Sequence, residues 1–236
     1  MWCYRLVAPF TFQRVEVPEP DPTRLADGQV LLRFLAAGIC GSDLPGFRGT
    51  QGRLPADTGR CAAELDGFPI HEIAGEVLAS AHPAHAVGDR VVGWASGFDG
   101  LQAHVVADGD GLSGYAADLT PAQAIGLQPL ACVLYAVEQL GDLTGKRVAV
   151  IGQGSIGLLF CYVAKAAGAA HVTGVDPVDR APLAQAFGVD ETVRATSDRW
   201  IRHLEPTAKF DVVIEAVGHQ VATLGHALEA AAFGAT

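Results

Sequence analysis

The amino-acid sequence predicts an α/β protein with two domains, a small β-rich domain over residues 1–118 and a doubly wound parallel sheet over 119–236. Two observations support this prediction. The first third of the chain holds short segments rich in Val, Leu and Phe, bounded by Pro, Gly and Asp, which is typical of strands joined by turns. After residue 146, apolar runs alternate with segments of helical spacing, which indicates strand–helix units with right-handed crossovers.

The β-rich domain is predicted to form a small barrel-like arrangement of short strands. The proline-rich segment 18–28 is predicted to be a surface turn region. The polar segment 46–68 shows little periodicity, so we expect a loop there, with one helical turn as a candidate at 62–65. The expected strands cover 12–17, 30–36, 73–79, 90–94 and 103–106.

The parallel domain is predicted to begin with a helix, for which Thr120 is the candidate cap and Pro121 the first position. Strands are expected at 147–151, 171–176, 191–195 and 211–217, with helices at 155–167, 180–187, 198–204 and 221–232. A complete doubly wound sheet has about six strands. The sheet predicted here is therefore incomplete at its C-terminal end, and its last strand would lack a partner on one side.

Composition narrows the classes of function. Half of the 236 residues are apolar and 18% are charged, which provides ample core and argues against disorder. The formal charge of −10 comes with no lysine or arginine cluster, so neither nucleic acid nor an anionic membrane is an expected partner. We find no membrane-spanning run and no signal-peptide pattern. Five scattered cysteines suit a reducing compartment, so a cytoplasmic location is expected.

The segment KRVAVIGQGSIG carries the first functional signal. An apolar run ends in Gly152-Gln153-Gly154-Ser155-Ile156-Gly157, a helical segment follows, and Asp176 closes the next apolar run 22 residues after Gly154. This order is the dinucleotide-binding fingerprint. Gly152 allows a tight turn, Gly154 lets the backbone approach a pyrophosphate, and the helix N-terminus offers free N–H groups to the phosphates.

A second group of residues offers the ligand types of zinc. Cys40 lies in GICGSD, and His71-Glu72 follows 31 residues later in HEIAGEV. A catalytic zinc site uses three protein ligands and leaves one position open. The third ligand, by residue type and position, is Glu72, Cys132 or Gln128. The alternative for a cysteine such as Cys132, one helical turn past Gln128, is a buried helix-core residue.

Four segments, taken in order, resemble the medium-chain dehydrogenase/reductase family. They are AAGICGSDL, HEIAGEV, GDRVVGW and the glycine fingerprint. More narrowly, they resemble its zinc-dependent alcohol, polyol and sugar dehydrogenases, over residues 5–236. The resemblance implies a GroES-like domain that carries the zinc, a Rossmann domain, and a cleft between them where an alcohol meets the nicotinamide. Members of the family are homo-oligomers, whose interface lies near the strands missing from the predicted sheet.

The resemblance also implies roles for individual residues. Cys40 and His71 match catalytic zinc ligands, and Glu72 matches a carboxylate that binds the metal or stands just behind it. Asp43 matches the acid that orients the ligand histidine, and Ser42 the hydroxyl that takes the alcohol proton. Gln128, in LQPL, falls where related enzymes have a glutamate or glutamine that binds the metal or its water.

Three positions depart from the family pattern. Pro45 stands where a histidine often helps to pass the proton to solvent, so the relay must differ. Ile70 replaces the usual glycine before His71. The segment ASGFDGLQAHVVADGDG lacks the cysteines of the lobe that holds a structural zinc, so we expect one catalytic zinc and no structural zinc.

These observations predict a zinc-dependent oxidoreductase that transfers a hydride between a secondary alcohol, polyol or sugar and NAD. Asp176 is expected to bind the ribose hydroxyls and to repel the extra phosphate of NADP. Arg180 is expected either to lie against the adenine or to be solvated. Two alternatives are a truncated nucleotide-binding relative without catalysis and a zinc-free enzyme of the quinone-reductase type.

Overall fold

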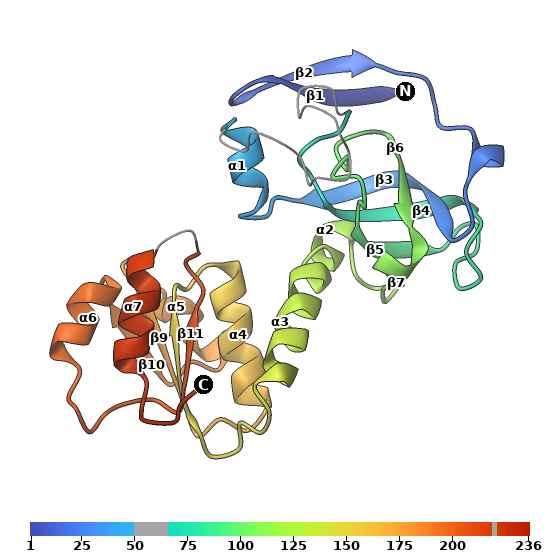
Figure 1. Cartoon of the computed structure of the whole chain (residues 1–236). Coiled ribbons are helices and arrows are strands. Elements are labelled where there is room, and N and C mark those ends of the chain that lie inside the picture. The colour runs from blue at the N-terminus through green and yellow to red at the C-terminus, as the bar shows by residue number, and fades with distance from the viewer. Residues whose placement is uncertain (50–65, 219–220) are drawn as a thin grey trace. The chain divides into compact units, whose positions relative to one another are not determined.

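The computed structural model describes residues 1–49, 66–218 and 221–236 (Figure 1), so the candidate helical turn at 62–65 lies outside the described residues. The chain divides into two compact units, Met1–Gln128 and Pro129–Thr236. The expected boundary at 118/119 lies just before helix α2 (Pro121–Ala124), whereas the division between the two units falls within α3 (Leu127–Gln139).

The first unit is built from antiparallel β-sheet. A hairpin pairs β1 (Trp2–Ala8) with β2 (Thr11–Glu16), and a five-stranded sheet has the order β6-β3-β4-β5-β7. Its strands are β3 (Gln29–Gly38), β4 (Glu72–Ser80), β5 (Arg90–Trp94), β6 (His104–Asp108) and β7 (Leu112–Gly114). All five predicted strands are present; β1 and β7 are additional. The short helix α1 (Asp43–Phe47) follows β3 and was not expected.

Alternating apolar residues of this sheet form the core of the first unit. Val30 and Leu32 of β3 point to the same face, as period-two alternation requires, and pack with Ile73 and Val77 of β4. Each is at most 2% exposed, and burial of such a side chain stabilises the fold by about 1.5–3 kcal/mol. The register of β3 on β4 ends with Gly38 opposite Glu72, which brings the two functional segments together.

The helix expected from Thr120 is interrupted. The Thr120 side chain caps α2 in a capping box with Gln123, as the sequence signal indicates. The α2 helix ends at Ala124, and α3 begins at Leu127, so Ile125 and Gly126 separate the two helices. Pro129 is accommodated because it stands in the first turn of α3, where its missing N–H has no helical partner.

The second unit is a parallel sheet with helices on both faces (Figure 1). Its strand order is β10-β9-β8-β11, as a doubly wound sheet requires. The strands are β8 (Arg147–Ile151), β9 (His171–Asp176), β10 (Glu191–Arg194) and β11 (Val212–Glu215). The helices are α4 (Ser155–Ala166), α5 (Ala181–Ala184), α6 (Ser197–His203) and α7 (Val221–Ala230), and a 3-10 turn (Gln185–Phe187) extends α5.

Alternation along β8 divides the core of this unit into two layers. Val148 and Val150 pack with residues of α3 and α4, whereas Ala149 and Ile151 pack with Trp200 of α6 and with residues of α7. A strand that is apolar on both faces is the signature of a covered parallel sheet.

The outer edge of β11 has a partner, contrary to the expectation from the strand count. Ala231 forms a parallel bridge with Phe210, and the Val213 N–H donates to the carbonyl of Thr236 at 3.1 Å. The residues after α7 therefore run beside β11 and begin to extend the sheet. Among the residues that the structure describes, no helix combines the length and apolar character needed to cross a membrane.

Candidate metal centre and nucleotide site

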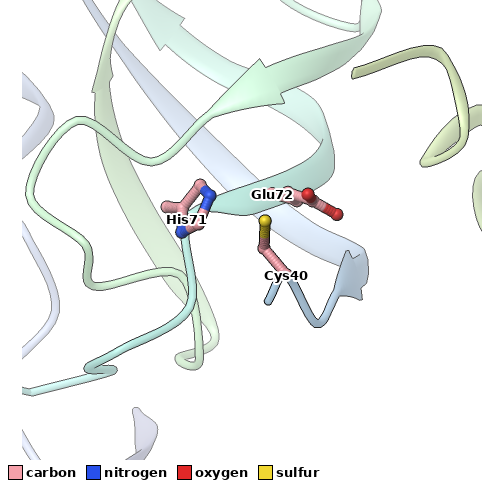
Figure 2. A group of neighbouring side chains, drawn as sticks. All are labelled: Cys40, His71 and Glu72. Carbon is pink, nitrogen blue, oxygen red and sulfur yellow. The ribbon is translucent and has the colours of Figure 1, made fainter. Parts of the chain in front are cut away.

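Three potential metal ligands converge in the first unit. One ligand atom each of Cys40, His71 and Glu72 lies within 4.8 Å of the other two (Figure 2). Cys40 comes from the segment after β3, while His71 directly precedes β4 and Glu72 is the first residue of that strand. Because β3 and β4 are antiparallel neighbours, the end of one lies beside the start of the other. The register of a single strand pair thus assembles residues that lie 31 positions apart.

The Asp43 carboxylate makes hydrogen bonds with two of these residues, His71 and Cys40. One carboxylate oxygen lies 2.7 Å from Nδ1 of His71, and the other accepts a hydrogen bond from the Cys40 backbone N–H at 2.8 Å. Asp43 is 3% exposed, so both bonds lie in a low-dielectric interior, where they are strong. With Nδ1 engaged by Asp43, Nε2 is the His71 nitrogen left to bind a metal.

The ionisable groups influence one another. Burial alone would lower the pKa of His71, but the hydrogen bond and charge of Asp43, together with the charge of Glu72, raise the pKa above its usual value. Burial raises the pKa of Glu72, against opposing contributions from a hydrogen bond with Cys40 and from His71. A divalent cation would favour the deprotonated forms of both side chains, because positive charge stabilises a carboxylate and a neutral imidazole lone pair.

The donor set fits zinc. Thiolate, imidazole and carboxylate are its usual ligands, and ligand atoms at 2.0–2.3 Å from zinc in a tetrahedron stand about 3.5 Å apart. The three donors of this site, within 4.8 Å of one another, need to close by only about 1 Å to reach that geometry.

The other residues predicted for this site have different surroundings. Gln128 is 6% exposed in the first turn of α3, and its role as a ligand stays a prediction. Cys132 is exposed, so its interpretation as a helix-core residue is wrong. Ser42 is exposed just before α1, and Pro45 lies inside that helix. Ile70 is 6% exposed, which explains how an apolar side chain can replace the expected glycine there.

Sequence reasoning missed the aromatic surroundings of the histidine. Trp94 stacks on the His71 ring, and Phe98 approaches the same ring at a tilt. Trp94 lies opposite Glu72 in the β4–β5 register. The motif GDRVVGW contains Trp94 but gives no signal of this contact, because the pairing of β5 with β4 is visible only in the folded chain.

The glycine fingerprint forms the predicted turn between β8 and α4. Gly152 has φ +92°, and a Cβ at Gly157 would overlap the carbonyl of Gly152, so both positions require glycine. Around Gly154 a Cβ would meet nothing within 4 Å, which leaves open space where a pyrophosphate approaches in this motif. The helix begins at Ser155, with Ile156 in its first turn, so the free N–H groups of α4 face this turn.

Asp176 is fixed at the end of β9. Its two carboxylate oxygens accept hydrogen bonds from the backbone N–H groups of Gln153, at 2.7 Å, and Val178, at 2.8 Å. Both bonds join it to segments that border a cavity of about 700 Å³. The lining includes Gly152, Gly154, Asp176, Arg180, Ser197 and His226.

Residues far apart in the sequence complete this cavity. Ser197 at the start of α6 lies 2.9 Å from Nδ1 of His226 on α7, and neither was predicted. Both follow strands of the sheet, and the rule that ligands bind at the carboxyl ends of parallel strands was the signal available for them. Arg180 also borders the cavity. Its Nε is buried and has no hydrogen-bond partner among the described residues.

Comparisons with known proteins agree with this arrangement. Residues 26–129 match the model of the alcohol dehydrogenase GroES-like domain, and 155–236 match that of the zinc-binding dehydrogenases. The chain is 30% identical to erythritol/L-threitol dehydrogenase of Mycolicibacterium smegmatis, over 89% of this chain and 67% of that protein. It is also 30% identical to (R,R)-butanediol dehydrogenase of Bacillus subtilis, over 70% of this chain and 54% of that protein.

Solved structures show the same fold. Galactitol-1-phosphate dehydrogenase from Escherichia coli superposes with a TM-score of 0.78 at 20% identity, over 98% of this chain and 72% of that one. Alcohol dehydrogenase from Thermus sp. ATN1 also gives 0.78, at 24% identity, over 100% of this chain and 75% of that one. The chain thus spans between about half and three quarters of the length of these relatives.

Proposed function

Because this chain belongs to the medium-chain dehydrogenase/reductase family, among its zinc-binding dehydrogenases, we propose that it transfers a hydride between a secondary alcohol, polyol or sugar and NAD. The observation that carries the proposal is the convergence of Cys40, His71 and Glu72, with Asp43 bonded to the histidine. The names of its relatives, which include an erythritol/L-threitol dehydrogenase and a butanediol dehydrogenase, support small polyols as the substrate class.

We propose that this chain holds a single zinc ion, which is catalytic. Cys40 and His71 supply two ligands, and Glu72 or Gln128 completes the set. When bound, the zinc acts as a Lewis acid that lowers the pKa of an alcohol hydroxyl, and NAD accepts the hydride. The carboxylate of Asp43 holds the proton on Nδ1 of His71, which would leave the Nε2 lone pair available to a metal.

Ser42 is proposed to take the proton of the substrate hydroxyl. It is exposed, and it directly precedes Asp43, whose backbone N–H donates to the Cys40 carbonyl at 3.1 Å. The turn that positions the ligand thiolate therefore also carries this hydroxyl. From Ser42 the proton can pass to solvent without the histidine that related enzymes use, since Pro45 occupies that position.

We propose NAD rather than NADP as the cofactor. The carboxylate of Asp176 borders the cavity and would accept hydrogen bonds from ribose hydroxyls, while its charge would repel a phosphate. Arg180 borders the same cavity and is proposed to lie against the adenine. A cytoplasmic location is proposed from the five scattered cysteines of the sequence, whose odd number suits a reducing compartment. The active form is proposed to be a homo-oligomer.

Metal analysis combined with a substrate screen tests this function. We expect about one zinc per chain, and NAD-dependent oxidation of small polyols that Cys40→Ser abolishes together with the metal. Cys132→Ser is the matched control, because this exposed thiol is not among the ligands proposed here. Less than about a tenth of a zinc per chain, with Cys40→Ser unchanged, would reject the metal site and favour a zinc-free enzyme. Tight NADH binding without turnover of any alcohol would favour a nucleotide-binding relative.

A further inference from the structure

The His71 ring contacts two aromatic side chains of one segment. Its centroid lies 4.8 Å from that of Trp94, with only 20° between the planes, and 5.3 Å from that of Phe98 at 58°. His71 itself is 2% exposed, whereas Trp94 is 40% exposed. A parallel stack of this kind covers one face of the imidazole with a large indole surface.

The backbone holds this segment firmly against the histidine. The Ala95 N–H donates to the carbonyl of His71 at 2.7 Å, and the Gly100 N–H donates to the carbonyl of Ile70 at 2.8 Å. Between these bonds the chain turns tightly, with Phe98 in the left-handed region at φ +55°. A non-glycine residue rarely adopts this conformation, so the surrounding bonds must maintain it.

Two contacts restrain the orientation of the His71 ring. The carboxylate of Asp43 accepts a hydrogen bond from Nδ1, which restrains that edge of the ring. The Trp94 indole fixes the plane of the ring. Together they hold the ring beside Cys40 and Glu72, the other two members of the candidate metal site (Figure 2). Because Asp43 engages Nδ1, Nε2 is the nitrogen that they orient for a metal.

We propose that Trp94 is a positioning residue of the metal centre, which orients His71 by stacking on its ring. The proposal rests on the proposed zinc site. Imidazole becomes electron-poor when its Nε2 binds a cation, and indole has the most electron-rich face among the aromatic side chains. The stack therefore strengthens when the metal binds, and Trp94 raises the affinity for the metal in addition to ordering the metal-free site.

The experiment measures metal binding to the full chain in the absence of substrate. Zinc affinity is determined by competition with a chromophoric chelator, and the d–d absorption of bound Co²⁺ reports the geometry of its ligands. We expect Trp94→Leu to weaken zinc binding about threefold to tenfold, the range of one aromatic pair. We also expect it to shift the Co²⁺ bands. Trp94→Phe, which keeps a flat ring, should restore most of both signals.

Controls separate positioning from folding. Trp2→Leu removes another aromatic partner of the same unit, which contacts Tyr4 and Phe34, and should leave the Co²⁺ bands unchanged. Trp94→Met provides a second non-aromatic variant, and circular dichroism verifies that each variant is folded. Wild-type zinc affinity and Co²⁺ bands in Trp94→Leu or Trp94→Met would overturn the inference, as would the absence of rescue by Trp94→Phe. Failure of the wild type itself to bind zinc through Cys40 would instead reject the proposed function.

Discussion

The Cβ position of Gly38 is occupied by the carboxylate of Glu72: a methyl group added there would overlap Oε2 and press on Cγ2 of Ile125. These two residues stand opposite each other where β3 and β4 end and begin. The glycine is therefore required by the neighbouring side chain, since its φ is not among the positive values that favour glycine. The carboxylate lies over the strand backbone because no side chain occupies that space.

Gly38→Ala should displace the Glu72 carboxylate and impair the metal site while the sheet still forms. We expect zinc binding to weaken about tenfold to a hundredfold, the range found when groups that support metal ligands are altered. Competition with a chelator measures this affinity. Gly114→Ala is the control, because this strand glycine in β7 has only the Arg90 carbonyl near it, at 4.0 Å. Equal zinc affinity in both variants would show that the position of Glu72 is unimportant for the metal.

Asp43→Asn should weaken zinc binding by reversing the tautomer of His71. The carboxylate accepts the Nδ1 proton, whereas an asparagine that turns its NH₂ group toward Nδ1 forces the proton onto Nε2. The expected loss of zinc affinity is again about tenfold to a hundredfold.

A second aspartate–histidine pair serves as the control for Asp43. The carboxylate of Asp110 lies 3.0 Å from Nε2 of His82, but this pair is distinct from the proposed ligands and Asp110 is almost fully exposed. Asp110→Asn should leave zinc affinity unchanged. If Asp43→Asn also binds zinc normally, the orientation of His71 does not depend on its carboxylate partner.

The sequence predicted the local features of this protein well, and it predicted poorly the side-chain contacts between neighbouring strands. The glycine turn, the cap at Thr120 and the strands β3 and β8 are encoded by nearby residues, and each appears in the structure. The stack of Trp94 on His71 and the contact of Gly38 with Glu72 depend on strand register. Strand register depends on the whole sheet, so it cannot be predicted from any one short segment.

The same limit applies to the ends of the sheet and to the first helix. A count of strands left β11 without an outer neighbour, yet the residues after α7 hydrogen-bond to its edge. The apolar spacing after Thr120 suggested one helix, and the interruption at Ile125 and Gly126 was missed. Cys40, His71 and Glu72 were proposed together from their residue types and the family resemblance, and the structure brings them together.

Asp176→Ala should reduce the preference for NAD over NADP. Removal of the carboxylate takes away the acceptor for the ribose hydroxyls and frees the backbone N–H groups of Gln153 and Val178 to meet a phosphate. We expect the ratio of dissociation constants for NADH and NADPH, measured by fluorescence, to shift at least about tenfold toward NADPH, or about 1.4 kcal/mol. Asp179→Ala is the control, since this nearby carboxylate caps the Ala181 N–H. An unchanged ratio in Asp176→Ala would contradict the assigned role.

Asp99 makes the stability of the first unit depend on pH. Burial raises the pKa of this carboxyl to about 6 from its usual 3.8, against weaker hydrogen bonds that include one from Gln102. One of its oxygens is buried without a hydrogen-bond partner among the described residues. The folded protein therefore binds the proton more tightly than the unfolded chain. Between about pH 4 and 6 the folded state holds more protons, so stability falls as the pH rises through this window.

The expected size of this effect is about 3 kcal/mol, from roughly two units of pKa at 1.36 kcal/mol each. Asp99→Asn removes the titrating group, so the unfolding free energy of the wild type minus that of the variant should fall by this amount from pH 3.5 to 7.5. Amide hydrogen exchange in the five-stranded sheet measures the first unit separately. Asp110→Asn controls for the loss of one exposed carboxylate in the same unit. A flat difference for Asp99→Asn would mean that water reaches the Asp99 carboxylate and that its pKa is ordinary.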